Sequence, residues 1–458
     1  MTLSRRRFLS QVAATSAVVA APTLARGRDA NGTLQVAVVG SNGMGFADLQ
    51  QVGSHPRVKF VGFCDIDSNR FGPADKAHPG VRHFADYREM MDTLGAGLDA
   101  VIVSCPDHMH APAAVAALQA GKHVYCQKPL THTVWEARQM RLWADRAGVT
   151  TQMGNQIHSA AEYRLGTRLI KDGAIGKVKE VWSWIGVTGN ERTRRLVPPP
   201  AAPVPANVNW DLWIGCAPMR DYAPVYHPFM WRDWQDFGGG GLGDFACHVL
   251  DPVFTALDIA EPLTVHARNS GINDQIWPTN EMVHYTFRGT RYTAGDTIKV
   301  TWMDGGLKPD RRLAQMPADH DLPGGGSLFV GEEGCMVLAH IAMPRLYPLE
   351  KFKDFKPPVV EARNHWHDWV DACLAGEKTT DGFHYAGPLT EAVQLGNIAT
   401  RLATPGNDPV SGQIVDAAKV LEWDMAALAF KNAPEADALV TKPYRKGFEV
   451  PAAPAGTA

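Results

Sequence analysis

Two separate segments of this 458-residue sequence contain side chains that can move protons. In the first, Lys128 follows a short apolar run at residues 123–126. If this run is a buried strand, the lysine lies at its carboxyl end, where open α/β sheets bind their ligands. Desolvation there disfavours the charged ammonium group, so Lys128 could donate or accept a proton near neutral pH. The alternative is a surface lysine whose stem packs on the protein while its charge stays in water.

In the second segment, a glycine run at residues 238–243 leads into Asp244, His248 and Asp251. Spacings of four and three residues place these side chains on one side of a helix. The glycines let the backbone approach a planar ligand, but the run lacks the lysine of a P-loop, so phosphate binding is not expected there. Two other interpretations stay open. One is a helix cap with a hydrogen-bonded core histidine, and the other is a metal site of histidine and carboxylates.

A nucleotide-binding turn is predicted upstream of both segments. The β-branched run 34–39 leads through a glycine-rich turn into a helix-like stretch at 46–52, which is the context that a dinucleotide fingerprint requires. Asn42 occupies the place of the fingerprint's second glycine, and it tolerates left-handed backbone angles better than most residues. Backbone N–H groups and the helix N-terminus would bind the pyrophosphate. The turn residues expected to contact the cofactor are Gly40, Asn42, Gly43, Met44 and Gly45.

A carboxylate at the end of the next apolar run favours NAD as the cofactor. The run 58–64 ends in Asp65, twenty residues beyond Gly45, where it could accept hydrogen bonds from the adenosine ribose hydroxyls. The same charge would repel a 2'-phosphate. Polar residues at 68–70 leave NADP as an open alternative.

Apolar runs and helix-like stretches alternate over residues 31–155, which predicts a doubly wound parallel sheet. A capping box of Thr133 and Glu136 opens one helix, and Gly148 ends it. From residue 156 to 431 we expect an α+β domain with a mainly antiparallel sheet, in which a helix at 389–402 returns to brace the first domain. Residues 432–458 are expected to form an extended tail. The candidate strands of the second domain are 178–184, 263–267, 281–287, 297–302 and 327–330.

The stretch 188–241 is irregular and rich in aromatic residues. Eight of the 28 residues from 210 to 237 are aromatic, a share well above the 9% of the whole chain. Aromatic faces stack on the C–H faces of sugar rings, and polar neighbours such as His227 and Arg232 could bind hydroxyl groups. The alternative is a loop packed on its own side chains. The eight residues are Trp210, Trp213, Tyr222, Tyr226, Phe229, Trp231, Trp234 and Phe237.

Residues 121–130, Gly-Lys-His-Val-Tyr-Cys-Gln-Lys-Pro-Leu, together with the glycine turn and the loop 105–110, resemble the glucose-fructose oxidoreductase/inositol dehydrogenase/rhizopine catabolism (GFO/IDH/MocA) family. The resemblance implies a Rossmann domain followed by an α+β domain whose large open sheet pairs subunits, hence a homo-oligomer. In that family the triplet is Glu-Lys-Pro, with the lysine beside the nicotinamide and a proline that is commonly cis. Here Gln127 replaces the glutamate, which removes a charge near the cofactor.

The resemblance also implies roles for residues of this chain. His248 would act as general acid/base together with Lys128, while Asp244 would orient the substrate or the imidazole and Asp251 would support them. The resemblance extends the predicted cofactor site to Cys105, Pro106, His110 and Gln127. The predicted substrate residues are Asn155, His158, Tyr163, His227, Trp231, Arg232 and Asp251.

Composition excludes several function classes. With 45 Lys+Arg against 48 Asp+Glu, the chain has no basic excess, so nucleic acid is not an expected partner. The seven cysteines are too sparse for a disulfide framework, and none forms a C-x-x-C pair, so we predict neither a metal nor a redox dithiol.

The first thirty residues are predicted to be an export signal and linker. Ser-Arg-Arg-Arg-Phe-Leu at residues 4–9 precedes a small apolar run at 12–25, which resembles a twin-arginine signal cleaved after about Ala25. The alternative is a disordered basic start. No later run is long and apolar enough for stable membrane insertion, so we expect an exported, periplasmic protein.

These observations predict hydride transfer between a sugar or polyol CH–OH and a nicotinamide cofactor. Outside the cytoplasm no soluble NAD pool is replenished, so we expect tight cofactor retention and a closed redox cycle. One alternative is a redox-neutral, NAD-dependent glycoside hydrolase or lyase that acts through a transient keto-sugar. A second is a non-enzymatic sugar or nucleotide sensor. It is suggested by Asn42 and Gln127, which replace the second glycine of the fingerprint and the glutamate of the family triplet.

Overall fold

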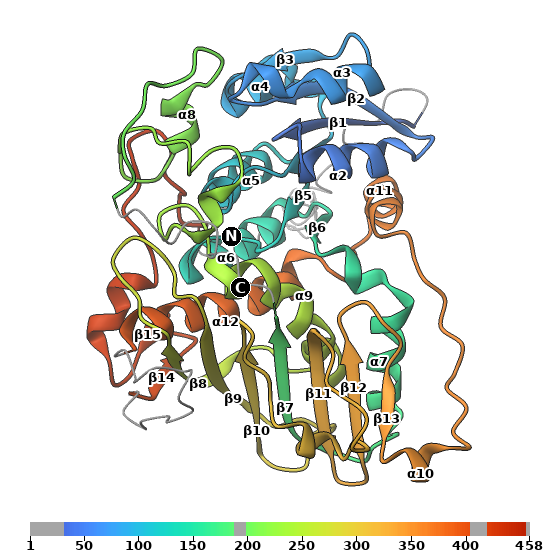
Figure 1. Cartoon of the computed structure of the whole chain (residues 1–458). Helices are drawn as coiled ribbons and strands as arrows, with labels where there is room; N and C mark the ends of the chain where they lie inside the picture. The colour runs from blue at the N-terminus through green and yellow to red at the C-terminus, as the bar shows by residue number, and fades with distance from the viewer. Residues whose placement is uncertain (1–31, 187–197, 404–418, 455–458) are drawn as a thin grey trace, which may run out of the picture.

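The computed structural model describes residues 32–186, 198–403 and 419–454. The predicted export signal at 1–30 lies outside the described residues, as does the start of the aromatic stretch up to residue 197. The chain forms two sheets, with the N-terminal sheet above and the C-terminal sheet below in Figure 1, and helices α9 and α12 between them.

The N-terminal sheet contains six strands in the described residues, all parallel, in the order β3-β2-β1-β4-β5-β6. Its central strands β1 and β4 are buried along nearly their whole length, as expected of a parallel sheet covered by helices on both faces. The capping box expected at Thr133 and Glu136 is present at the start of α6, and Gly148 ends that helix in a left-handed conformation. The strands are β1 (Leu34–Val39), β2 (Val58–Cys64), β3 (Arg82–Phe84), β4 (Ala100–Val103), β5 (His123–Gln127) and β6 (Thr151–Gly154). The helices are α2 (Met44–Gly53), α3 (Gly72–Ala77), α4 (Tyr87–Leu94), α5 (His110–Gln119) and α6 (Val134–Ala147).

The C-terminal sheet has nine strands in the described part of the chain, in the order β13-β12-β11-β7-β10-β9-β8-β14-β15. Every neighbouring pair is antiparallel except β7 and β10. This confirms the expected fold class of a parallel N-terminal sheet followed by a mainly antiparallel one. The strands are β7 (Val178–Ile185), β8 (Pro262–Asn269), β9 (Glu281–Arg288), β10 (Thr297–Met303), β11 (Gly325–Gly331), β12 (Cys335–Ala339), β13 (Arg345–Tyr347), β14 (Leu421–Asp424) and β15 (Ala429–Phe430).

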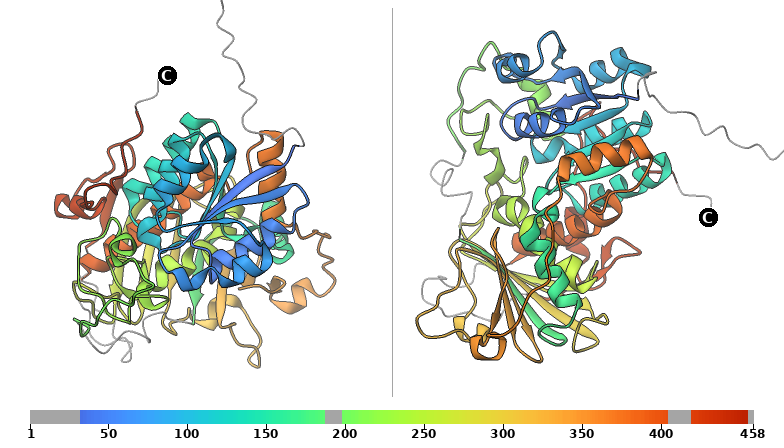
Figure 2. Two further views of the ribbon diagram at one scale, coloured as in Figure 1. Left: turned by 90° about the horizontal axis from the view of Figure 1, so that it is seen from above. Right: turned by 90° about the vertical axis from the view of Figure 1, so that its right-hand side faces the viewer.

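Helices from the second half of the chain join the two sheets. Helix α12 contacts β8 and β9 of the lower sheet and also α6 and β6 of the N-terminal domain, while α9 contacts β7 and β11 (Figure 2). Helix α11 packs against α2 and β1, so it covers the N-terminal sheet even though it follows the C-terminal one in the sequence. These helices are α7 (Ala161–Lys171), α8 (Trp210–Ile214), α9 (Gly240–Leu257), α10 (Leu349–Phe352), α11 (His365–Ala375) and α12 (Phe383–Leu402).

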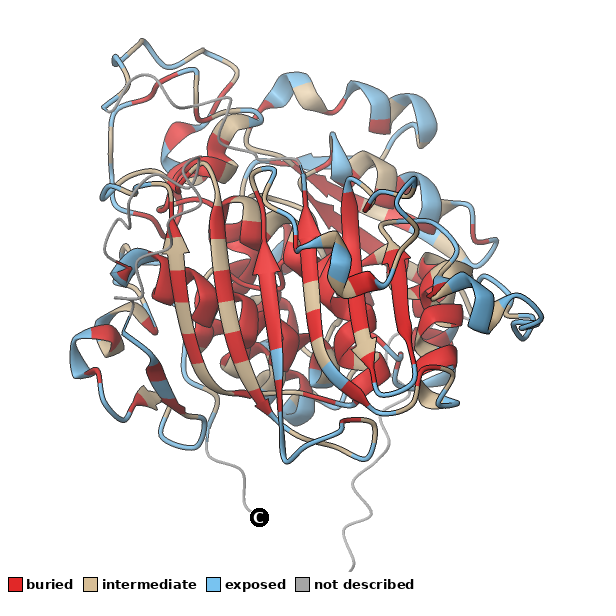
Figure 3. Cartoon of the chain, turned by 60° about the horizontal axis from the view of Figure 1, so that its bottom comes forward, coloured by how far each residue is buried: buried red, intermediate tan, exposed pale blue. Residues whose placement is uncertain are grey.

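The outer face of the C-terminal sheet is half-buried. Along β9 the inward side chains of Val283, Tyr285 and Phe287 are buried, whereas the outward ones, such as His284 and Thr286, are only partly covered (Figure 3). Pairing of subunits through this face stays a prediction. Among the described residues, no helix combines the length and apolar character that crossing a membrane requires.

The aromatic stretch packs largely on its own side chains. Trp210 stacks on Trp213 with ring centroids 4.6 Å apart, and Tyr226 contacts Trp234 edge-on at 4.8 Å. The stretch is also less irregular than expected, because it contains α8 and a short 3-10 helix at Met230–Asp233. Within it, Phe229 is half-exposed, at 51%.

The close packing of the glycine turn against β1 and β4 makes a first prediction. A Cβ added at Gly45 would collide with the carbonyl oxygen of Gly40, whereas one added at Gly97 would meet nothing within 4 Å. Gly45→Ala should therefore lower the free energy of unfolding by about 1–3 kcal/mol and weaken NADH binding. Gly97→Ala is the matched control. Urea denaturation and NADH titration of both variants measure this, and equal behaviour of the two would contradict the packing argument.

Candidate active site

A cavity of about 510 Å³ opens at the carboxyl ends of the N-terminal strands. The glycine turn and Asp65 line one end, and Lys128 and His248 line the other. Ligands of open α/β sheets bind at this edge. The cavity is also lined by residues with no role predicted from the sequence, among them Asp107, Phe245 and Phe448.

The glycine turn packs closely against the backbone at the end of β4. Gly40 has φ 86°, and a Cβ there would meet the carbonyl oxygen of Ser104 at 2.6 Å. Gly43 has φ 58°, while Asn42 is absent from the described non-glycine residues with positive φ. The left-handed conformation expected of Asn42 is therefore supplied by its neighbour. The Asn42 amide instead donates to the carbonyl oxygen of Arg70 (2.9 Å) and accepts from the Gly43 N–H (2.7 Å), which ties the turn to the loop after Asp65.

Asp65 follows β2 directly, and its carboxylate is held by the turn itself. One oxygen accepts from the Ser41 N–H at 3.0 Å and the other from the Asp67 N–H at 3.1 Å. Burial raises the pKa of Asp65, and these hydrogen bonds oppose that shift. A carboxylate at this cavity wall is the group that would bind the ribose hydroxyls and repel a 2'-phosphate.

Lys128 and Asp244 meet at the other end of the cavity. The Lys128 ammonium donates to a carboxylate oxygen of Asp244 at 2.6 Å and to the Asp244 carbonyl oxygen, also at 2.6 Å. Arg232 approaches the same carboxylate oxygen at 3.3 Å. Although burial opposes ionisation, Lys128 and Arg232 hold the pKa of Asp244 below its ordinary value. The peptide bond between Lys128 and Pro129 is cis, as the resemblance implied.

His248 is held in one orientation by Asn155. Its Nδ1 lies 2.6 Å from the Asn155 side-chain oxygen, and the Asn155 amide donates to the carbonyl oxygen of Cys247 at 3.1 Å. With its amide committed in this way, Asn155 accepts a hydrogen bond from the Nδ1–H of His248, so Nε2 carries the lone pair. Burial, reinforced by the positive charge of Lys128, lowers the pKa of His248 well below its ordinary value. The imidazole is therefore neutral and can accept a proton.

Gln127 is paired with a carboxylate that the sequence reasoning missed. Its amide donates to Asp48 at 2.8 Å, and Asp48 also accepts from Ser104 at 2.8 Å and from Trp366 at 3.0 Å. Burial raises the pKa of Asp48 to about 6, with these hydrogen bonds opposing the shift. A negative charge thus lies one hydrogen bond behind the position where the family glutamate would be.

The loop 105–110 lines the cavity beside Lys128. His110 lies 2.8 Å from the carbonyl oxygens of both Pro129 and Cys105, so it joins the loop to the cis peptide bond. Burial lowers the pKa of His110 to about 4. Burial also raises the pKa of Asp107 to about 7, against the opposing charges of Arg232 and Lys128.

The structure places some of the predicted substrate residues at the cavity and others away from it. His227, Trp231 and Arg232 line the cavity, and Asn155 holds His248 from behind. Tyr163 does not line the cavity, and its hydroxyl lies 2.8 Å from Nδ1 of His340. His158 and Asp251 pair with each other instead, at 2.8 Å, away from the cavity lining. We expected Asp251 to support His248. Instead, its carboxylate contacts His158.

The residues present fit a nicotinamide dinucleotide. A Cβ at Gly40 or Gly45 would collide with the backbone of Ser104 or Gly40, so these glycines allow the tight turn that a dinucleotide site requires, and α2 begins at this turn without a side-chain cap. The carboxylate of Asp65 closes the adenosine end. Gly40, Gly43 and Asp65 would hold the cofactor, and when bound it would supply a hydride acceptor beside Lys128.

Two protein-family models match the chain, one over the N-terminal sheet and the other over part of the C-terminal sheet. One, described as "Oxidoreductase family, NAD-binding Rossmann fold" (GFO/IDH/MocA), matches residues 34–155. The other, "Oxidoreductase family, C-terminal alpha/beta domain", matches residues 183–304. The first matched range includes the glycine turn and Lys128, and the second includes His248.

Curated relatives match shorter stretches. A 1,5-anhydro-D-fructose reductase of Ensifer adhaerens is 40% identical over 80 residues, which is 18% of this chain and 24% of that protein. A glycosyl hydrolase family 109 protein of Stenotrophomonas maltophilia is 30% identical over 139 residues, covering 27% of this chain and 29% of that protein. The chain thus spans well under half the length of these relatives.

Solved structures share the fold over most of the chain. The WlbA dehydrogenase of Bordetella pertussis, in complex with NADH and UDP-GlcNAcA, superposes with a TM-score of 0.56 at 17% identity. The match covers 81% of this chain and 97% of that one. The chain has an NAD-binding Rossmann domain.

The position of Asp65 predicts a preference for NADH. Asp65→Asn keeps the shape of the side chain but removes the charge that repels a 2'-phosphate, so the ratio of NADPH to NADH dissociation constants should fall about tenfold. Titration with both cofactors measures the ratio. Asp75→Asn, in an exposed pair with His83, is the control and should leave the ratio unchanged. An unaltered ratio in Asp65→Asn would remove this carboxylate from the cofactor site.

Proposed function

Since the chain belongs to the GFO/IDH/MocA oxidoreductase family, we propose that it oxidises or reduces a CH–OH group of a sugar or polyol with NAD as cofactor. One observation carries the proposal. A neutral histidine, His248, and a charged lysine, Lys128, line the same end of a cavity whose other end has the features of a dinucleotide site.

The two side chains divide the proton chemistry. Nε2 of His248 accepts the proton of the substrate hydroxyl, because Nδ1 is already engaged with Asn155. The Lys128 ammonium donates to the same oxygen and stabilises the negative charge that develops on it. Asp244 holds that ammonium in place at 2.6 Å. NAD, when bound, supplies the hydride acceptor.

The cavity wall near these groups suits a carbohydrate. Trp231, Phe229 and Phe245 offer aromatic faces, and Arg232 and His227 offer hydrogen-bond donors. Such a mixture of flat apolar surface and a few polar groups is typical of small-molecule sites. The similarity to a sugar-derivative reductase supports the same substrate class.

Redox-neutral cleavage of a glycoside is the second candidate function. It is favoured by the similarity to a glycosyl hydrolase family 109 protein. In this reaction a sugar hydroxyl is oxidised to a ketone, and a base such as His248 removes the acidified neighbouring C–H proton. The aglycone leaves, water adds to the resulting double bond, and the ketone is reduced again, so that the net change is hydrolysis.

We further propose that the protein is exported through its twin-arginine sequence with NAD tightly retained. A closed redox cycle follows from that location, because the cofactor is not exchanged. Mature protein purified from the periplasm should release close to one equivalent of NAD(H) per chain on denaturation, measured by mass spectrometry. A cofactor-free chain that binds added NAD only weakly would refute retention.

Substrate tests distinguish the two reactions. A panel of aldoses, polyols and p-nitrophenyl glycosides is added to the protein, and NADH absorbance and p-nitrophenol release are recorded together. NADH formed in step with sugar oxidation supports the oxidoreductase. Release of p-nitrophenol with no net NADH supports the redox-neutral hydrolase. If no compound is converted, a binding protein becomes the better interpretation.

Variants at the two proton-moving residues test the mechanism. His248→Asn and Lys128→Met should each lower kcat by about 100-fold or more while the protein stays folded. Lys122→Met is the matched control, because Lys122 precedes β5 at the opposite end from Lys128, and its ammonium donates to the carbonyl oxygens of Gly95 and Leu98. A control as slow as Lys128→Met would show that the loss reflects folding rather than chemistry.

A further inference from the structure

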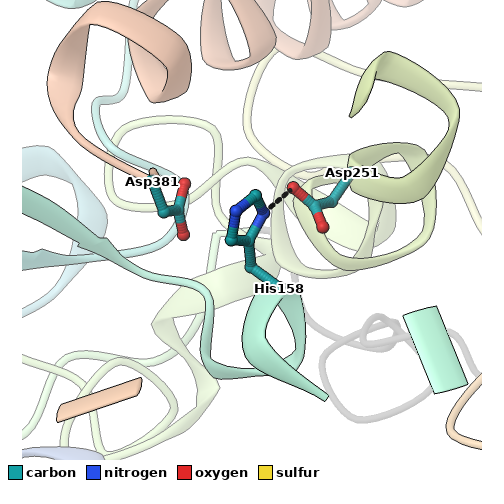
Figure 4. Close-up of side chains that lie close together, drawn as sticks. All are labelled: His158, Asp251 and Asp381. Atoms are coloured by element: carbon teal, nitrogen blue, oxygen red, sulfur yellow. Dashed lines mark hydrogen bonds and ion pairs between the residues drawn. The ribbon is translucent and has the colours of Figure 1, made fainter. Parts of the chain in front are cut away.

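A second group of ionisable side chains lies apart from the cavity. His158, Asp251 and Asp381 each offer one nitrogen or oxygen atom, and these atoms all lie within 4.8 Å of one another. Figure 4 shows the imidazole between the two carboxylates, which come from different parts of the chain. None of the three residues lines the cavity.

Asp251 orients the imidazole of His158. One Asp251 oxygen lies 2.8 Å from Nδ1 of His158 and also accepts from the Tyr385 hydroxyl at 2.7 Å. The second ring nitrogen, Nε2, lies 3.2 Å from the Thr380 hydroxyl and faces Asp381 (Figure 4). A carboxylate that holds one nitrogen of a histidine while the other faces a ligand is the usual support of a metal-binding imidazole.

Asp381 is the independent observation that points to a ligand. Its side chain is 1% exposed, and neither carboxylate oxygen has a hydrogen-bond partner within the described part of the chain. A buried carboxylate without a partner is costly, and most buried polar atoms in proteins are paired. Both oxygens face the imidazole, so the unfilled capacity lies inside the cluster.

The charges of the cluster favour a bound cation. Asp251 is 2% exposed and Asp381 is 1% exposed. The atoms that the two carboxylates offer lie within 4.8 Å of each other. Two buried carboxylates thus draw positive charge to the site, either as protons or as a metal ion.

We propose that His158 and Asp381, supported by Asp251, bind a divalent transition-metal cation such as Zn²⁺ or Mn²⁺. An imidazole nitrogen with carboxylate and hydroxyl oxygens is a donor set that suits these ions. Ligand atoms around such an ion, with bonds of about 2.0–2.2 Å, lie roughly 3–3.5 Å apart. The 3.2 Å between Nε2 and the Thr380 hydroxyl matches this spacing, and Asp381 offers an oxygen within 4.8 Å of the atoms offered by His158 and Asp251.

The proposed cation would brace the active site without taking part in the reaction. Asp251 lies on α9 three residues after His248, and His158 lies three residues after Asn155. The ion would therefore link the two segments that orient the catalytic imidazole. His158 is 11% exposed at its side chain, which leaves a path for an ion from solvent.

Metal binding is measured on the full mature protein carrying no histidine tag. After dialysis against Zn²⁺ or Mn²⁺ and gel filtration, elemental analysis should find about one ion per chain, and the ion should raise Tm. Asp381→Asn should abolish retention, and Asp251→Asn should weaken binding about 10–100-fold. His83→Asn, in the exposed pair with Asp75, is the control and should bind as the wild type does.

The wild-type titration decides the proposal even if a variant fails to fold. No retained metal and no change in Tm with either ion would overturn it. Retention that persists in Asp381→Asn, or that is lost equally in His83→Asn, would also overturn it, because the ion would then bind elsewhere. If the wild type retains no metal and Asp381→Asn has a higher Tm than the wild type, the carboxylates share protons and do not bind a metal ion, which also overturns the proposal.

Discussion

The ion pair between Lys128 and Asp244 holds the two halves of the site together. It joins the carboxyl end of β5 in the N-terminal sheet to Asp244 near the start of α9, which packs on the C-terminal sheet. Removing Asp244 would leave the Lys128 ammonium without this carboxylate, which costs several kcal/mol. Removing Lys128 would leave Asp244 with Arg232 as its remaining ion-pair partner. The glycine run permits the pair, because Gly240 adopts φ 66° and a Cβ at Gly241 would meet Asp304. This contact fixes Lys128 at the end of the cavity that His248 also lines.

Local patterns predicted most of the fold and part of the site. The glycine turn, the capping box at Thr133 and the five candidate strands are visible in sequence because each is decided by neighbouring residues. Strands β12 to β15 were missed because they are short. Contacts between distant residues could not be read in this way. Asp48 meets Gln127 across 79 positions, and Phe448 reaches the cavity from the tail. The aromatic stretch was ambiguous for the same reason, since stacking on a ligand and stacking on itself require the same residues.

The replacement of the family glutamate by Gln127 changes where the charge lies, not whether there is one. The amide of Gln127 donates to Asp48, so its carbonyl oxygen carries the polarisation of a carboxylate behind it toward the cavity. Asp48 is completely buried and is held by Ser104 and Trp366 as well. Four donors on one carboxylate keep it in place. A neutral residue at position 127 is therefore compatible with an electrostatic environment suited to a cofactor.

Two enclosed histidines of this region differ in charge because their neighbours add to the effect of burial in one case and override it in the other. His248 and His158 are both largely enclosed, and burial alone would keep both neutral. His248 faces an amide oxygen and the Lys128 ammonium, so it stays neutral, as a proton acceptor must be. His158 faces two carboxylates, so positive charge is drawn to its site, on the ring or on a bound ion. The two segments that carry them, residues 155–158 and 248–251, run side by side, with Asn155 against His248 and His158 against Asp251. Asn155 thus pairs with the imidazole that can react, His248, whereas Asp251 pairs with the imidazole that can brace it, His158.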